Sequence, residues 1–223
     1  MLNLNELTPF AQGSNRYCFI HPENPNICLK VIRPENIELR FNRQSVLKKC
    51  LGKKRLNDNR QEIAAYHQSA LKSLIAAGEI QLAWRHLPEL FGSVVTSMGP
   101  ANASELIRSA DGTIAPTLED LLKKDGYTPL LKAAVGRFIL WLKTHGILTR
   151  NLLPHNLVLS DRSGTAELFL VDGLGAPPFQ NRMAHITRWR NHYIRRKSER
   201  FKQRIEWEAL GRNTTWEAFQ KIE

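Results

Sequence analysis

Cysteine is scarce in this sequence of 223 residues, which has only Cys18, Cys28 and Cys50. An odd number of cysteines without a Cys-x-x-Cys pair argues against a disulfide framework, a zinc ribbon and a thioredoxin-like site. Long apolar runs are also missing, because no uninterrupted stretch approaches the roughly 20 residues that cross a bilayer. The first ten residues lack the basic and apolar regions of a signal peptide. We therefore expect a cytoplasmic protein with reduced thiols.

Acidic residues are outnumbered by basic ones, with 21 Asp and Glu against 32 Lys and Arg and a formal net charge of +11. This balance predicts an anionic partner, but it does not choose among nucleic acid, acidic lipid, phosphate and an acidic protein. Hydrophobic residues make up 42% and charged residues 24% of the chain. These proportions are typical of a folded globular protein and exclude disorder as its main state.

Strand-like and helix-like patterns occupy different parts of the chain. Residues 17–20 and 27–32 are β-prone and flank a turn rich in Pro and Asn, which predicts a hairpin. Apolar residues at helical spacing follow later, most clearly over residues 130–144. The pattern predicts an α+β fold with a sheet-rich N-terminal lobe, residues 1–104, and a helical C-terminal lobe, residues 105–223.

Two polar residues frame a second predicted hairpin. Asn156 is the first of the β-prone residues 156–159. Asp172 directly follows the β-prone residues 168–171 and precedes Gly-Leu-Gly. The two arms of one hairpin place both residues near its open end. Amide and carboxylate oxygens in this arrangement suit Mg²⁺, which takes few protein ligands and completes its shell with phosphate and water.

Residues 149–156, Thr-Arg-Asn-Leu-Leu-Pro-His-Asn, resemble the catalytic loop H-R-D-L-x-P-x-N of protein-kinase-like enzymes. Val-Asp-Gly-Leu-Gly at residues 171–175 resembles the metal-binding D-F-G of that family. Cys-Leu-Lys-Val at residues 28–31 resembles the strand that carries its phosphate-binding Lys. Residues 56–74 predict the first long helix after this strand, and they contain a Glu at the place where the family keeps the partner of that Lys. Gly-Ser-Asn-Arg-Tyr-Cys-Phe at residues 13–19 stands where the family has its Gly-rich loop.

The resemblance implies a two-lobed protein-kinase-like fold that binds ATP and Mg²⁺. Lys30 would pair with Glu62 and reach the phosphates, and Asn156 and Asp172 would hold the metal. Backbone amides of the Gly-rich loop would cover the phosphates, and a segment joining the lobes would meet the adenine. The nucleotide-binding residues implied in this way are Gly13, Ser14, Asn15, Lys30, Glu105 and Ile107.

The chain resembles more closely the PhoP regulatory network YrbL-like family, which is kinase-like in fold. This similarity covers most of the chain and implies a regulatory role. It rests on residues 18–23, 27–31, 61–63, 105–107, 152–157 and 189–201.

Two departures from the kinase pattern concern chemistry. Asn151 occupies the position of the catalytic Asp, and an amide cannot take up a proton at neutral pH. Losing a general base costs about 10²–10⁴ in rate. The Gly-rich loop keeps only Gly13, so its backbone approaches phosphates less freely. We expect either an atypical phosphotransferase that uses Asn151, with Lys30 and Glu62, or a pseudokinase that binds nucleotide.

The helical lobe also departs from that of a protein kinase in size. Fifty-one residues follow Asp172, too few for a full activation segment and substrate-docking helices. The sequence therefore predicts a reduced C-terminal lobe.

The C-terminal part, residues 181–223, carries eleven Lys and Arg against five Glu. Its apolar residues follow helical spacing with Lys197 as the one gap. They are Ile186, Trp189, Tyr193, Phe201 and Ile205. Either this helix packs on the helical lobe and leaves a solvated basic face, or its residues 182–204 dock to an anionic membrane surface or an acidic protein.

No recognised DNA-reading module accompanies this basic helix, so we do not expect a nucleic-acid partner. The alternative to a nucleotide-binding protein is a non-catalytic regulatory module that binds an anionic partner through the helix.

Overall fold

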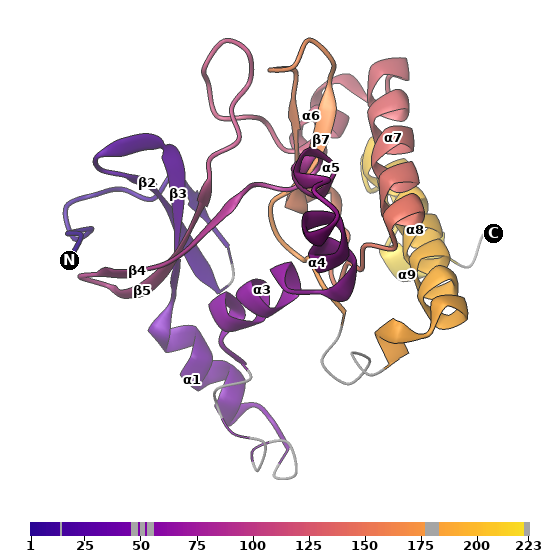
Figure 1. The fold of residues 1–223 in the computed structure, drawn as a ribbon. Coiled ribbons are helices and arrows are strands. Elements are labelled where there is room, and N and C mark those ends of the chain that lie inside the picture. The colour runs from indigo at the N-terminus through magenta and orange to yellow at the C-terminus, as the bar shows by residue number, and fades with distance from the viewer. Residues whose placement is uncertain (14, 46–48, 50–51, 53–55, 177–182, 221–223) are drawn as a thin grey trace. The chain divides into compact units, whose positions relative to one another are not determined.

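The structure is a computed structural model that describes residues 1–220 except 14, 46–48, 50–51, 53–55 and 177–182 (Figure 1). The chain divides into two compact units. The first contains residues 1–66 and 88–106, and the second contains residues 67–87 and 107–223. No helix in the described ranges combines the length and the apolar composition needed to cross a membrane.

The first unit is built on an antiparallel sheet with strand order β1-β2-β3-β5-β4. The strands are β1 (Ala11–Gln12), β2 (Arg16–His21), β3 (Asn24–Ile32), β4 (Leu90–Thr96) and β5 (Gly99–Glu105). The first predicted hairpin is confirmed, because β2 and β3 pair with Tyr17 opposite Val31. Among the residues that the structure describes, this unit contains the helices α1 (Pro34–Asn42) and α3 (Asp58–Tyr66).

Alternation along β3 separates an apolar face from a polar one. Leu29 and Val31 are buried in a core with Phe19 and Ala103. Lys30 lies between them in sequence and therefore points to the opposite face. Helix α3 packs on that face, since the Nδ2 of Asn59 donates to the carbonyl oxygen of Lys30 at 2.8 Å. The strand thus carries a buried Lys toward a helix.

The second unit is mainly helical. Its helices are α4 (Ser69–Ala76), α5 (Ile80–Trp84), α6 (Leu118–Asp125), α7 (Pro129–His145), the 3-10 turn η2 (Pro154–Asn156), α8 (Thr187–Ala209) and α9 (Trp216–Phe219). Strands β6 (Leu157–Ser160) and β7 (Glu167–Leu170) form the second predicted hairpin, with Leu157 opposite Leu170. The α+β prediction is confirmed.

Helices α7 and α8 lie side by side in this unit (Figure 1). The predicted helix over 130–144 is α7, which Thr128 caps by accepting from the N–H of Leu131. Gly146 ends it in a left-handed conformation with φ 68°. Phe138 of α7 meets Phe201 of α8 in the buried core.

The helix predicted over 56–74 is in fact two helices, α3 and α4. Gln68, just before α4, has an extended backbone, with φ −61° and ψ 149°. Its side-chain oxygen accepts from the N–H of Leu148 at 2.8 Å, and this contact explains the break. Residues 67–87 therefore belong with the second unit, whereas the sequence placed them in the N-terminal lobe. The N–H of Leu170 also donates to His86 at 2.9 Å.

Helix α8 buries the apolar stripe that the sequence predicted, with one exception. Tyr193, Phe201 and Ile205 are buried and Trp189 is half-buried. Ile186 is 53% exposed because it precedes the first turn of the helix and does not share its periodicity. This packing matches the first of the two predicted arrangements for the C-terminal helix.

Candidate functional site

The first group of candidate residues lies on the polar face of the sheet in the first unit. The Nζ of Lys30 lies 2.6 Å from the Oε1 of Glu62 on α3. Lys30 is 5% exposed and Glu62 is 7% exposed. The structure thus brings together the Lys and the Glu that the sequence pattern singled out.

Arg16 is a member of this group that the sequence reasoning missed. Its Nη1 lies 2.7 Å from the Oε2 of Glu62, and the Nδ2 of Asn102 donates to the same oxygen at 2.9 Å. Arg16 is itself buried, so two cations share one carboxylate away from water. Alternation along β2 was the available signal, because Arg16 and Cys18 face the same side as Lys30.

Cys28 is buried on the same face of the sheet as Lys30. A hydrogen bond with Cys18 and burial together raise the pKa of the Cys28 thiol well above its usual value. A raised pKa keeps the sulfur protonated, so Cys28 acts as a small packing residue at neutral pH.

The predicted Gly-rich loop is a closed turn at Gly13. The N–H of Gly13 donates to the carbonyl oxygen of Arg16 at 2.9 Å, so this amide is occupied within the chain. The carbonyl oxygen of Asn15 accepts from the N–H of Arg33 at 2.9 Å. Ser14 lies outside the described residues.

Glu105 and Ile107 flank the end of the first unit. Glu105 is the last residue of β5, and its N–H donates to the carbonyl oxygen of Glu89 at 2.8 Å. Ile107 is buried in the second unit, where its carbonyl oxygen accepts from Ala115 at 3.1 Å. These backbone groups are thus engaged in the fold at the positions expected to meet the adenine.

The second group of candidate residues lies where the loop before η2 meets the segment after β7. The N–H groups of Arg150 and Asn151 both donate to the carbonyl oxygen of Gly173, at 2.7 and 3.1 Å. The Nδ2 of Asn156 donates to the carbonyl oxygen of Asn151 at 2.9 Å. Hydrogen bonds therefore connect Asn151 both to Asn156 and to Gly173, the residue that follows Asp172.

Asn156 and Asp172 present oxygens of the type that Mg²⁺ prefers. Asn156 is 7% exposed, and its Nδ2 bond to Asn151 fixes the amide plane. The Oδ1 of Asp172 accepts from the N–H of Gly173 at 2.7 Å. The described residues contain no group of three or more His, Cys, Asp or Glu that could hold a metal. A two-residue set still fits Mg²⁺, which takes its remaining ligands from phosphate and water.

Helix α8 holds the same loop from its other side. The hydroxyl of Tyr193 donates to the carbonyl oxygen of Thr149 at 3.0 Å, and the Nζ of Lys197 donates to that of Arg150 at 2.7 Å. Burial raises the pKa of Tyr193 to about 12, so its hydroxyl stays a donor. The contact of Lys197 explains why a basic residue interrupts the apolar stripe of the helix.

Gly173 provides a test of how closely the two segments approach. Its φ is +87°, and a Cβ there would lie 2.4 Å from the carbonyl oxygen of Asn151. We expect Gly173→Ala to lower the free energy of unfolding by more than about 2 kcal/mol, measured by urea denaturation. Gly164→Ala is the matched control, because its φ is +77° and nothing lies within 4 Å of the added carbon. Equal losses in the two variants would contradict the close approach.

The two groups define a class of protein: an α+β protein with a buried Lys–Glu pair on its sheet and a loop bearing Asn and Asp residues in its helical unit. Residues 2–206 match the family described as PhoP regulatory network protein YrbL, and the chain belongs to this family. The YrbL proteins of Escherichia coli (strain K12) and Shigella flexneri are each 24% identical over 212 residues, which cover 92% of this chain and 86% of theirs. The family predicted from the sequence is thereby confirmed.

A solved structure with some likeness to the chain is that of a mutant PknI kinase domain of Mycobacterium tuberculosis. The sequence identity is 15% and the TM-score is 0.38. The match covers 76% of this chain and 59% of that chain, so this chain spans less than two thirds of that kinase domain.

Proposed function

We propose that the protein is a kinase-like regulatory protein that binds ATP together with Mg²⁺. The observation that carries the proposal is the buried Lys30–Glu62 pair. Burying an ion pair is often no more stabilising than apolar packing, so its retention favours a role beyond stability. A Lys on a strand, held by a carboxylate from the adjoining helix, is the arrangement that kinases use to present a cation to phosphates.

Different residues bind the phosphates and the metal in the proposed site. Lys30, oriented by Glu62, contacts phosphate oxygens, and Asn156 and Asp172 hold Mg²⁺. When bound, the metal neutralises phosphate charge. The sequence also predicts backbone contacts from residues 13–15 and 105–107, although the N–H groups of Gly13 and Glu105 already donate within the chain. The closed turn at Gly13 agrees with a loop that covers phosphates less tightly than a Gly-rich one.

Regulation through nucleotide binding, with little phosphotransfer, agrees best with Asn151. Its exposed side chain is an amide, which cannot act as a general base. The family description places its members in the PhoP regulatory network. We propose that this protein has a regulatory role of that kind.

Removing the ammonium group of Lys30 tests the proposal directly. We expect Lys30→Met to weaken binding of ATP with Mg²⁺ tenfold or more, which corresponds to about 1.4 kcal/mol. Isothermal titration calorimetry measures the affinity, and circular dichroism checks that the variant is folded. Lys72→Met, on the exposed side of α4, is the matched control and should bind like the wild type. Equal affinity in the folded Lys30 and Lys72 variants would remove Lys30 from the site.

The metal ligands predict a dependence on Mg²⁺. In the wild type we expect Mg²⁺ to strengthen ATP binding, and we expect Asp172→Asn to lose most of this gain. An Asn side chain keeps the acceptor for the N–H of Gly173 but has no charge for the metal. Asp125→Asn at the exposed end of α6 controls for the charge change. If metal has no effect on the wild type in a thermal-shift assay with ATP, the pair is not a metal site.

The alternative is a non-catalytic module that acts through the basic face of α8. The observation that favours it is a group of cations on this helix that form no ion pair with a described carboxylate. In this alternative the protein would show no ATP binding that depends on Lys30, so the calorimetric titration separates the two functions.

A further inference from the structure

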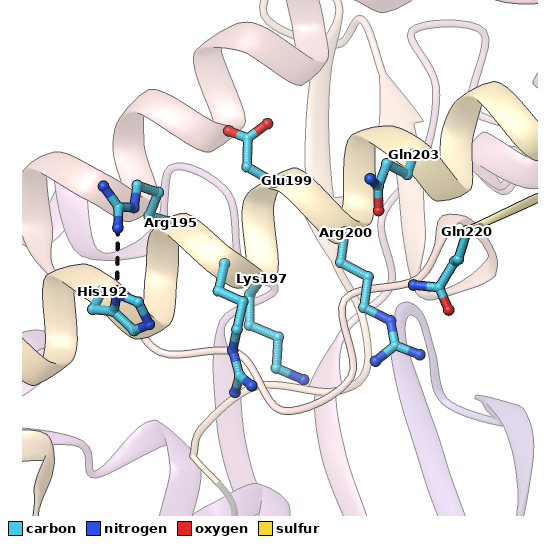
Figure 2. A pocket seen from close by; sticks show the side chains of 8 residues that line it. His192, Arg195, Lys197, Glu199, Arg200, Gln203 and Gln220 are labelled. Carbon is cyan, nitrogen blue, oxygen red and sulfur yellow. Dashed lines mark hydrogen bonds between the residues drawn. The ribbon is translucent and has the colours of Figure 1, made fainter. Parts of the chain in front are cut away.

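A cavity of about 660 Å³ lies along α8 in the second unit (Figure 2). Four of its lining residues carry a permanent positive charge and one carries a carboxylate. The lining residues are His192, Arg195, Arg196, Lys197, Glu199, Arg200, Gln203 and Gln220. With four cations and one carboxylate, the lining of the cavity is strongly cationic. Residue 182, the first residue of the predicted docking segment 182–204, lies outside the described residues.

The four cations of the cavity lack carboxylate partners among the described residues, unlike their neighbours on the helix. Arg204 pairs with Glu208 at 3.3 Å, and Lys202 pairs with Glu199 at 3.4 Å. The one carboxylate that lines the cavity is thus already engaged by a lysine outside it. In Figure 2, Glu199 points to the side of α8 opposite to Lys197 and Arg200. Positive charge in the cavity is left for a ligand to neutralise.

Burial and the neighbouring cations both act on the charge of Lys197. Burial lowers the pKa of its ammonium, and the charges of Arg196 and Arg200 lower it further. A bound anion relieves this repulsion and strengthens the positive form of Lys197. The cations around Lys197 therefore favour the binding of an anion.

The spacing of the cations indicates the size of the anion. Arg196 and Arg200 are one helical turn apart, about 6 Å along the axis. Linked phosphates match this length better than one phosphate group does. In Figure 2, Lys197 and Arg200 point to one side of α8, whereas Arg195 lies on the other side, 3.3 Å from the Nδ1 of His192. Arginine binds phosphate with paired, charge-assisted hydrogen bonds, and three of the four cations are arginines.

Helix α8 is poorly suited to lie on a membrane. Such a helix inserts an exposed apolar face among the lipids. Here the apolar face is buried in the protein, with Ile194, Phe201 and Ile205 at most 3% exposed. The cations also line a hollow, which favours a compact molecule in solution over a flat lipid surface.

We propose that the α8 cavity binds a compact soluble polyanion with two or more linked phosphate groups, and that the ligand tightens the loop at residues 149–151. The link is Lys197, which lines the cavity and also donates to the carbonyl oxygen of Arg150 at 2.7 Å. An ammonium group has three donors, so it holds the loop and a phosphate together. Tightening of the loop would regulate the protein only if the proposed function is correct, because the loop belongs to the proposed nucleotide site. Binding of the polyanion to the cavity does not depend on the proposed function.

Inorganic tripolyphosphate is the probe, titrated calorimetrically into the full-length protein that carries Lys30→Met. The Lys30→Met substitution removes the phosphate contact of the proposed nucleotide site. The titration therefore reports on the α8 cavity whether or not the proposed nucleotide site exists. We expect one binding site, and we expect adding Arg196→Gln and Arg200→Gln to weaken binding at least tenfold. Arg188→Gln, at an exposed position of the same helix outside the cavity, should leave the affinity unchanged. Equal weakening by the control variant overturns the site and indicates non-specific attraction to a basic helix.

Two further arms test the chemistry of the ligand. Inorganic phosphate should bind much more weakly than tripolyphosphate, and equal affinities overturn the requirement for linked phosphates. Vesicles of phosphatidylserine and phosphatidylcholine test the lipid source. Binding to these vesicles without binding of tripolyphosphate overturns the proposal in favour of a membrane surface.

Amide hydrogen exchange tests the link to the loop. Saturating tripolyphosphate should raise protection at Arg150 and Asn151, whose N–H groups donate to Gly173. Lys197→Met should abolish this rise even at ligand concentrations that saturate the variant. Protection that stays the same or falls in the wild type overturns the link to the loop.

Discussion

Asn151→Asp is expected to raise the rate of ATP turnover by about 10²–10⁴, because a positioned carboxylate supplies the general base that the wild-type loop lacks. The backbone at this position is held from two sides. The N–H of Asn151 donates to Gly173 at 3.1 Å, and its carbonyl oxygen accepts from Asn156 at 2.9 Å. The side chain is exposed and Asp has nearly the same shape, so the substitution requires no repacking.

Release of ADP from purified protein, with and without an added protein acceptor, measures the turnover of both forms. Asn191→Asp, at an exposed position of α8, controls for the added charge. Adding Asp172→Asn to the Asn151→Asp variant should abolish the gain. Equal and substantial turnover in the wild type and the variant would show that this residue has no special role. A loss of rate in the variant would indicate an enzyme adapted to use the amide.

Glu62→Ala is expected to lower the free energy of unfolding by about 3–5 kcal/mol, the cost of removing one partner from a buried ion pair. The carboxylate of Glu62 contacts Lys30 at 2.6 Å and Arg16 at 2.7 Å, and all three residues are buried. Without it, two buried cations lose the negative charge that they share. The Nδ2 of Asn102 also loses its acceptor on Glu62.

Urea denaturation measures this loss. Glu199→Ala is the matched control, because its partner Lys202 is exposed and such a pair contributes less than about 1 kcal/mol. The triple variant Arg16→Met, Lys30→Met and Glu62→Met should regain most of the stability that Glu62→Ala loses, because apolar residues replace buried ion pairs at little cost. We expect this stable variant not to bind ATP. A loss below 1 kcal/mol for Glu62→Ala would show that water or other groups stabilise the two cations.

Local pattern was sufficient for much of the fold. Two β-prone runs on either side of a turn rich in Pro and Asn identified the hairpin of β2 and β3, and helical spacing with a final Gly identified α7. Both signals are local, because they depend on residue type and on the spacing of neighbouring residues along the chain. The helix predicted over 56–74 shows the limit of this reasoning. The break before Gln68 depends on its hydrogen bond to Leu148, 80 residues away in sequence.

The candidate site was predictable only where residues match a linear motif. Lys30, Glu62, Asn156 and Asp172 were found in this way, and the structure brings Lys30 and Glu62 within 2.6 Å. The motif at residues 13–19 assigns no role to Arg16, and its contact with Glu62 forms because α3 packs on the sheet so that one carboxylate meets two strands. Its partner Glu62 lies 46 residues away in sequence, and residue spacing within one helix or strand cannot predict a contact over this separation.

By itself, the sequence determined the family, the α+β class, the basic character of α8 and the presence of an amide in place of a catalytic carboxylate. These properties depend on residue identity and on short-range spacing. Only the tertiary structure decided that Gly173 lies against the backbone of Asn151 and that Lys197 joins a cationic cavity to the same loop. Those contacts link residues 22 and 47 positions apart, and they form only when the packed helices and the hairpin fix both ends in space.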